Sequence, residues 1–484
     1  MRQGFAPILA LLLTTLACGG GQGGPGTGGS PTPGTPTPPP PSGATYVTHK
    51  NPILPTLGSA PPAKGESRVD PVTGIRITRL TSATELAGTP DAFIVYSRFS
   101  PESSDGKFVL VHGANSTSSW VVDRTTGNVV AALASDDSGR SDRTIGENHE
   151  VRWDASGAHP NRVYFRNGMQ LWMIDDVTRP SATRSLLRDF AAEVPGATMI
   201  YNDVEGDSSL DGDHWAFMAV HYNGSTYVVD AFLHYRISTN TLHKLVPADL
   251  AGSPLAGALA GRTTFLARPN MVEMAPDGSG VVIHYGRAYA GWNDAHIGTW
   301  FDGPHLWPVD FRWATSTPVK IAVDETHSGW AHGLDGRPLF ISQNNRTDKL
   351  DAVFTAGTGA GYDARVAVAG HGDFGWNNGF HYGKVPVTRK GWAFLSTYDT
   401  SNSAWGSNQL LFIQIKPESA SPKVWRIGSN YNRYAGDYRD EAPAALNLAG
   451  NRIYVSTNWG GMLDHREVFV FHLPDDWTSA APLQ

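Results

Sequence analysis

Several things are scarce in this sequence of 484 residues, and each scarcity excludes a class of protein. There is a single cysteine, Cys18, so no intramolecular disulfide can form and the folded part must be stabilised by burial. Charged residues make up only 17% of the chain, the net charge is -7, and no basic block is present, which argues against nucleic-acid binding. No apolar run reaches the roughly 20 residues of a membrane span.

The N-terminal 44 residues are interpreted as signal and linker. Arg2 precedes an apolar run over residues 5–16, and Thr15-Leu16-Ala17-Cys18 resembles a bacterial lipobox, with Thr where Leu is usual. Residues 1–18 are therefore predicted to be a lipoprotein signal peptide with Cys18 as the lipidated residue. The alternative is an ordinary signal peptide with an incidental cysteine. Residues 19–44 are rich in Gly and Pro and are expected to be a disordered tether.

This reading makes the protein an exported lipoprotein of the outer membrane, either facing the periplasm or exposed on the cell surface. We expect the lipid anchor to be its only membrane contact and the protein to be a monomer.

One structural unit recurs along residues 45–484: an extended run, a tight turn ending in Gly, an alternating apolar strand and a second strand. The seven turns are Asp105-Gly106, Ser156-Gly157, Asp211-Gly212, Asp277-Gly278, Asp335-Gly336, Lys390-Gly391 and Ala449-Gly450. Such turns are typical of hairpins. The last unit has too few strands, and an additional strand at residues 74–80 precedes the first unit. The pattern predicts an all-β, seven-bladed β-propeller closed by this N-terminal strand; a pair of β-sandwiches is the alternative.

When the units are aligned on their turns, polar and aromatic residues concentrate on the face opposite the turns. Single His residues are often structural, but aromatics interleaved with amides, His and Arg are what a carbohydrate cleft requires. The residues predicted to bind substrate are Arg98, His112, Tyr222, Trp292, Asn344, Arg346, Tyr382 and Trp459.

Three short segments carry a family resemblance. Val281-Val-Ile-His-Tyr285, His305-Leu-Trp-Pro-Val-Asp310 and Thr326-His-Ser-Gly-Trp330 resemble the core of the oligogalacturonate lyases, which are seven-bladed propellers, and the opening strand also resembles the ulvan-lyase propellers. The resemblance implies that His284 is a catalytic base and that His327 binds a divalent metal.

The chain departs from the family in its last blade, where Asp437, Asp440 and Glu441 stand in place of further metal-binding His. Carboxylates at these positions could hold a hard cation such as Mn²⁺ or Ca²⁺. We therefore predict His327, Asp440 and Glu441 as metal ligands.

β-Elimination in a uronate polysaccharide would suit these residues, because a cation or Arg must cover the carboxylate while a neutral base takes the C5 proton. His284 or Tyr285 could be the base, Arg287 could neutralise the carboxylate, and His149 is a further catalytic candidate on the same face. An acidic polysaccharide or oligosaccharide is the expected partner. The rival hypothesis is a non-catalytic, TolB-like propeller that binds glycan or protein in the cell envelope.

Overall fold

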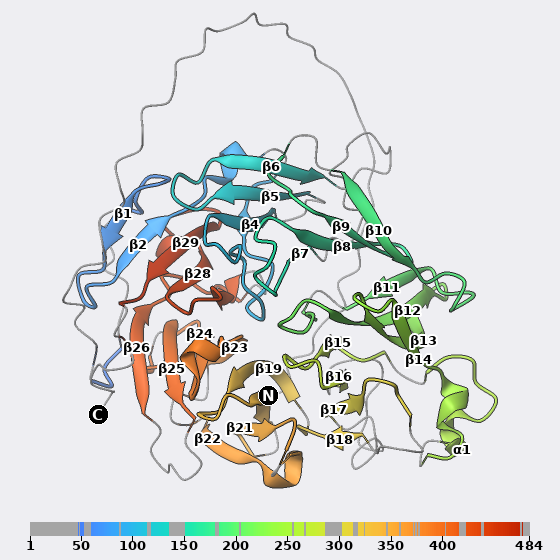
Figure 1. Cartoon of the computed structure of the whole chain (residues 1–484). Helices are drawn as coiled ribbons and strands as arrows, with labels where there is room; N and C mark the ends of the chain where they lie inside the picture. The colour runs from blue at the N-terminus through green and yellow to red at the C-terminus, as the bar shows by residue number, and fades with distance from the viewer. Residues whose placement is uncertain are drawn as a thin grey trace, which may run out of the picture. The chain divides into compact units, whose positions relative to one another are not determined.

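The computed structural model describes residues 47, 49–52, 60–86, 89–113, 118–134, 151–179, 183–202, 205–253, 256–265, 268–285, 303–312, 318–323, 325–344, 347–357, 360–370, 372, 375, 378–401, 403–415, 423–436, 440–474 and 477. They belong to one compact unit spanning residues 40–484. Within it, seven antiparallel sheets form a seven-bladed β-propeller, as the sequence predicts (Figure 1).

Each of the first six blades has four strands that follow one another along the chain. Blades 1 to 3 consist of β3 (Ala92–Phe93), β4 (Phe108–Gly113), β5 (Ser118–Asp123) and β6 (Val129–Ala134); β7 (Arg152–Trp153), β8 (Val163–Asn167), β9 (Gln170–Ile174) and β10 (Arg184–Asp189); and β11 (Met199–Tyr201), β12 (His214–Tyr222), β13 (Tyr227–Arg236) and β14 (Thr241–Leu245).

Blades 4 to 6 consist of β15 (Met271–Met274), β16 (Gly280–Tyr285), β17 (Gly303–Pro308) and β18 (Val319–Lys320); β19 (Glu325–His332), β20 (Pro338–Asn344), β21 (Lys349–Phe354) and β22 (Val366–Gly370); and β23 (Gly379–Gly383), β24 (Trp392–Tyr398), β25 (Gln409–Gln414) and β26 (Val424–Ser429). The helical elements of the described residues are short and include α1 (Ala256–Leu259) and 3₁₀ turns at Ala83–Glu85, Pro247–Leu250, Tyr362–Ala364, Val387–Arg389 and Trp459–Gly461. No described helix has the length and apolar character needed to cross a membrane.

The seventh blade is built from both ends of the domain. Its strands are β27 (Ala444–Leu446), β28 (Arg452–Thr457) and β29 (Glu467–His472), followed by β2 (Arg76–Arg79) and β1 (Ser67–Val69). β2 pairs antiparallel with β29 and supplies the predicted closing strand, while β1 adds a fifth strand at the edge. The buried carboxylate of Glu467 fastens this closure by accepting hydrogen bonds from Arg79 (2.9 Å), the Thr81 hydroxyl (2.5 Å) and the Ala83 amide (2.8 Å).

The seven predicted turns connect the first and second strands of the blades. Their glycines all have φ between 67° and 85°, the left-handed region that a side chain makes costly, which explains why Gly ends each turn. Apolar residues of neighbouring blades pack together; Leu80, Val111 and Tyr454, for example, share one buried cluster between blades 7 and 1. Because the blades of a propeller pack around an axis, the starts of their first strands meet at the face opposite the turns.

The chain also contacts blade 6 before it reaches the closing strand. Val47 forms a β-bridge with Arg426 of β26, whose guanidinium donates to the carbonyl oxygens of His49 (2.8 Å) and Asn51 (2.7 Å). Val47, His49 and Asn51 are thus held against blade 6.

Candidate metal centre and substrate site

Side chains from opposite blades cross the propeller axis. In blade 1, Tyr96 and Arg98 follow β3; the Tyr96 hydroxyl lies 3.2 Å from His381 Nδ1 in blade 6, and Arg98 reaches Glu273 of blade 4 and Ser328 of blade 5. β15 and β19 lie across the ring from blade 1 (Figure 1). Polar contacts therefore cross the axis, and its two ends are the places to look for a ligand site.

Local strand geometry sets the position of His327 on β19. The pairing of β19 with β20 shifts between Glu325, opposite Asn344, and Ser328, opposite Ser342. Thr326 and His327 lie in this irregularity. A β-bulge bends its strand and changes the direction of a side chain. The bulge stands at the start of β19, on the face opposite the Asp335-Gly336 turn.

Three potential metal ligands meet at this place from three consecutive blades. His327 comes from β19, His381 from β23, and Glu441 from the segment preceding β27, and one ligand atom of each lies within 4.8 Å of the others. His381 Nε2 and Glu441 Oε2 are 3.0 Å apart. Two ligands bound at right angles to one cation at about 2.1 Å are separated by roughly that distance. The donor set of two imidazoles and a carboxylate therefore fits a divalent cation.

The electrostatics of the group also suit a metal ligand. Burial lowers the pKa of His327 to about 3, and the nearby His381 and Arg98 add to this effect. At neutral pH the imidazole is therefore neutral, which is the form that binds a metal. The Tyr96 hydroxyl beside Nδ1 of His381 occupies the place of the second hydrogen-bond partner that usually orients a metal-binding imidazole.

Aromatic rings stand beside these ligands. The Tyr398 ring lies 5.4 Å from that of His381 and 5.0 Å from that of Tyr434, and both tyrosines are partly exposed. Such rings can stack on the apolar faces of a sugar. Ligands for a cation and stacking surfaces for a carbohydrate thus lie together at this end of the axis.

His284, the base implied by the resemblance, lies on β16 and is completely buried. Its Nε2 hydrogen bonds to Glu273 Oε1 at 2.9 Å, and its Nδ1 has no hydrogen-bond partner among the described residues. Burial would raise the pKa of Glu273, but the charge of Arg98 and the hydrogen bond from His284 outweigh burial and lower it. Glu273 is therefore ionised and holds the His284 proton on Nε2. Tyr285 is buried too, and burial raises the pKa of its phenol strongly.

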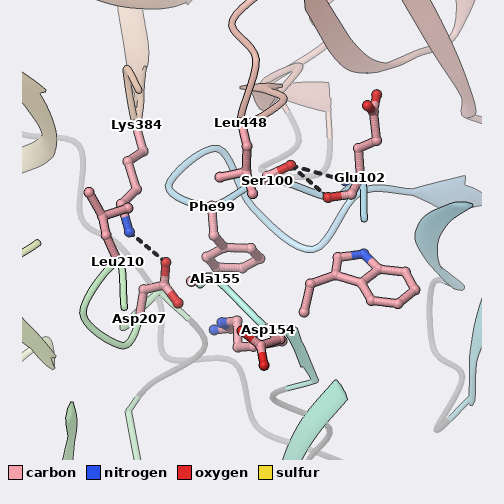
Figure 2. A pocket seen from close by; sticks show the side chains of 11 residues that line it. Phe99, Ser100, Glu102, Asp154, Ala155, Asp207, Leu210, Lys384 and Leu448 are labelled. Carbon is pink, nitrogen blue, oxygen red and sulfur yellow. Dashed lines mark hydrogen bonds and ion pairs between the residues drawn. The ribbon is translucent and has the colours of Figure 1, made fainter. Parts of the chain in front are cut away.

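The opposite end of the axis lies on the side of the turns. There the ammonium of Lys384 in blade 6 pairs with Asp207 in blade 3 at 2.8 Å, beside Phe99, Leu210 and Leu448 (Figure 2). The cavity that these residues help to line measures about 30 Å³. It could hold a water molecule but not a sugar. The end that carries His327 also holds the three potential metal ligands, which makes it the better candidate for ligand binding.

The remaining sequence-predicted residues are distributed more widely. Asp440 lies next to Glu441 but pairs with Arg466 at 3.2 Å and is not one of the three clustered ligands. Five predicted substrate-binding residues are buried: Arg98, His112, Asn344, Tyr382 and Trp459. Trp459, for example, is stacked between Tyr431 and Phe469.

Two of the predicted substrate-binding residues end long strands. Asn344 is buried and donates to Asp351 at 2.8 Å. Tyr222 is 56% exposed at the end of β12, where its ring meets that of Tyr227 at a centroid distance of 5.4 Å. The other predicted residues, Cys18, His149, Arg287, Trp292 and Arg346, lie outside the described residues.

Sequence reasoning missed His381 as a ligand and Glu273 as the partner of His284. His381 does fall on the predicted polar face, so only its role was missed. Glu273 gave one available signal: it is a single acidic residue within the apolar strand Met271–Met274, and such a residue usually has a buried partner. The second potential metal group, Asp211, Asp213 and His214, lies at the turn of blade 3; there Asp213 is paired with Arg236 at 2.8 Å.

No family model matches the sequence, and neither does any curated protein. Among solved structures, an oligogalacturonate lyase from Vibrio parahaemolyticus matches with a TM-score of 0.52 and 12% identity, covering 85% of this chain and 97% of its own. An oligogalacturonate lyase in complex with manganese matches with a TM-score of 0.52 and 12% identity, covering 90% and 100%. The fold is thus similar to the one that the sequence resemblance predicts.

Proposed function

We propose that the protein binds a divalent cation through His327, His381 and Glu441 and cleaves a uronate-containing oligosaccharide by β-elimination. The observation that carries the proposal is the convergence of these three ligands at the end of the axis opposite the turns. Two of the three donors are imidazole nitrogens, which favours Mn²⁺ over Ca²⁺, since Ca²⁺ prefers oxygen ligands alone. The fold similarity to oligogalacturonate lyases, one of them in complex with manganese, supports this choice.

The chemistry follows from the acidity of the sugar. A bound cation would neutralise the uronate carboxylate and so make the C5 proton easier to remove. Tyr398 and Tyr434 offer ring faces on which the sugar can stack. The proton acceptor in this proposal is His284, whose Nε2 is hydrogen-bonded to Glu273 and whose Nδ1 has no hydrogen-bond partner among the described residues. Since His284 is completely buried, this role requires the side chains around it to move when substrate binds.

The enclosure of His284 is also the observation that favours a second candidate function, a non-catalytic propeller that binds an acidic glycan in the cell envelope. The two candidates share the cation centre and differ only in turnover. Purified protein with Mn²⁺ should be incubated with a panel of uronate polymers and oligomers while the absorbance of the unsaturated product is followed. Absorbance that appears with Mn²⁺ and disappears with a chelator supports the lyase, whereas glycan binding without absorbance supports the binding protein.

The proposed location of the protein is outside the cytoplasm, on the outer membrane, through lipidation of Cys18. If this is correct, Cys18→Ala releases the protein from the membrane fraction. Unchanged fractionation, with no acylated peptide in mass spectrometry, would refute the anchor without affecting the proposed activity.

A further inference from the structure

We infer that Arg98 is a positioning residue that joins the cation centre to the Glu273–His284 pair. The inference rests on the proposed cation site and goes beyond it, because it gives a buried side chain far from the surface a role in ligand binding. It also replaces the sequence-based expectation that Arg98 contacts the substrate directly.

The guanidinium of Arg98 makes polar contacts on two sides. Nη1 donates to the carbonyl oxygen of Ser328 at 2.5 Å and to its hydroxyl at 2.6 Å, while Nη2 pairs with Glu273 Oε1. Ser328 directly follows His327 and is the residue at which regular pairing with β20 resumes after the bulge. Arg98 therefore fastens one end of the bulge that aims His327.

On its other side, Arg98 shares an acceptor with His284. Glu273 Oε1 accepts from Arg98 Nη2 and from His284 Nε2, which lies 2.9 Å away. The side chains of Arg98, Glu273 and His284 are each at most 1% exposed, so the ion pair is not screened by water. A displacement of β19 at Ser328 would thus move Arg98 and, through it, the Glu273 carboxylate that orients His284.

The shape of Arg suits this place and that of Lys does not. A planar guanidinium can donate to two acceptors on one side and pair with a carboxylate on the other, whereas an ammonium is a point charge at the end of a flexible chain. Arg98→Lys keeps the positive charge but cannot keep the contacts to both Ser328 and Glu273. If Arg98 served only to neutralise Glu273, the lysine variant would be sufficient.

The test is Mn²⁺ affinity, measured by titration calorimetry on the full chain. Arg98→Lys and Ser328→Ala are expected to weaken Mn²⁺ binding by about 10–100-fold, the usual effect of removing a group that orients a metal ligand. Ser328→Ala removes only one hydrogen-bond acceptor of Arg98. It can therefore be measured even if the Arg98 variant does not fold. In the double variant the two effects should not add, because both act on the same contact.

Arg426→Lys is the matched control, since Arg426 is equally buried but lies on β26 and bonds to the carbonyls of His49 and Asn51. It should lower the melting temperature and leave Mn²⁺ affinity unchanged. Mn²⁺ affinities of Arg98→Lys and Ser328→Ala equal to that of the wild type would overturn the inference. A wild type that binds no Mn²⁺ would instead refute the cation site itself.

Discussion

His327 and His112 show how differently two histidines of one propeller can be placed. His327 is partly buried beside His381, and its ring belongs to the group of three potential metal ligands. His112 is buried on β4, with its Nδ1 3.0 Å from the Ser119 hydroxyl. We expect His327→Ala to lower Mn²⁺ affinity at least tenfold while leaving the melting temperature nearly unchanged. His112→Ala should do the opposite, losing about 1–3 kcal/mol of stability through its hydrogen bond. Equal Mn²⁺ affinity in the two variants would argue against the site.

Tyr222 and Tyr227 offer a second test at the scale of single residues. They face each other at the end of the β12–β13 hairpin, on the same face as His327, and are 56% and 38% exposed. If these rings stack on a sugar chain that extends beyond the cation centre, Tyr222→Ala should weaken the binding of long oligouronates severalfold and leave a disaccharide unaffected. Affinities should be compared by calorimetry with both ligands. An equal loss for both lengths would point to a damaged fold instead of a lost contact.

For single residues, the sequence predicted the face of the propeller on which they lie but not the direction of their side chains. The polar face was predictable because hairpin turns mark the other face. The direction of each side chain was not, since Trp459 and Tyr382 satisfy the same pattern as exposed aromatics but are buried. His381 lies 54 residues from His327 along the chain, and no local motif joins them; only the ring of blades does.

At the scale of elements, the junction of β2 with β29 should make stability depend on pH. His472 is buried there, with its Nε2 2.9 Å from the Thr78 hydroxyl. Burial, aided by the charges of Arg76, Arg452 and Arg124, lowers its pKa to about 3. In the unfolded chain it would titrate near 6.5, so between these values the unfolded state binds the extra proton.

The stability contributed by a neutral His472 is thus complete above about pH 6.5 and is lost as the pH falls towards 3. His472→Gln keeps a hydrogen-bonding side chain and removes the titration. Denaturant unfolding at several pH values should therefore show that the variant takes up fewer protons on unfolding than the wild type in this window, by up to one proton. The free energy of unfolding that the variant loses at pH 4 should be smaller than the wild-type loss by up to a few kcal/mol. Identical slopes in variant and wild type would mean that His472 does not titrate on unfolding.

The blades themselves were predictable because each is encoded locally: a Gly-ended turn, followed by strands of alternating pattern. Closure was predictable because the last unit lacks a strand and residues 74–80 supply one. The additional strand β1 was not predicted, since Ser67–Val69 is a three-residue edge strand without an apolar pattern. The contact of His49 and Asn51 with Arg426 was not predicted either, because it uses backbone carbonyls that any sequence provides.

At the scale of the whole molecule, the ring depends on its N-terminal strands. Deleting the chain through Ser82 removes β1, β2 and two partners of the buried Glu467, so the ring would open. We expect this truncation to lower the melting temperature far more than deletion through Ala44, which leaves the contacts of residues 47–51 in place. Equal melting temperatures for the two truncations would contradict closure by β2.

The proposed activity and the proposed role of Arg98 both depend on a cation at the meeting point of blades 5, 6 and 7. The most direct measurement is a crystal of the protein soaked in Mn²⁺, with anomalous diffraction used to locate the metal. If the proposed site is correct, a peak lies in contact with His327, His381 and Glu441. A peak only elsewhere, such as beside Asp211, Asp213 and His214, or no peak at all at saturating Mn²⁺, would contradict it.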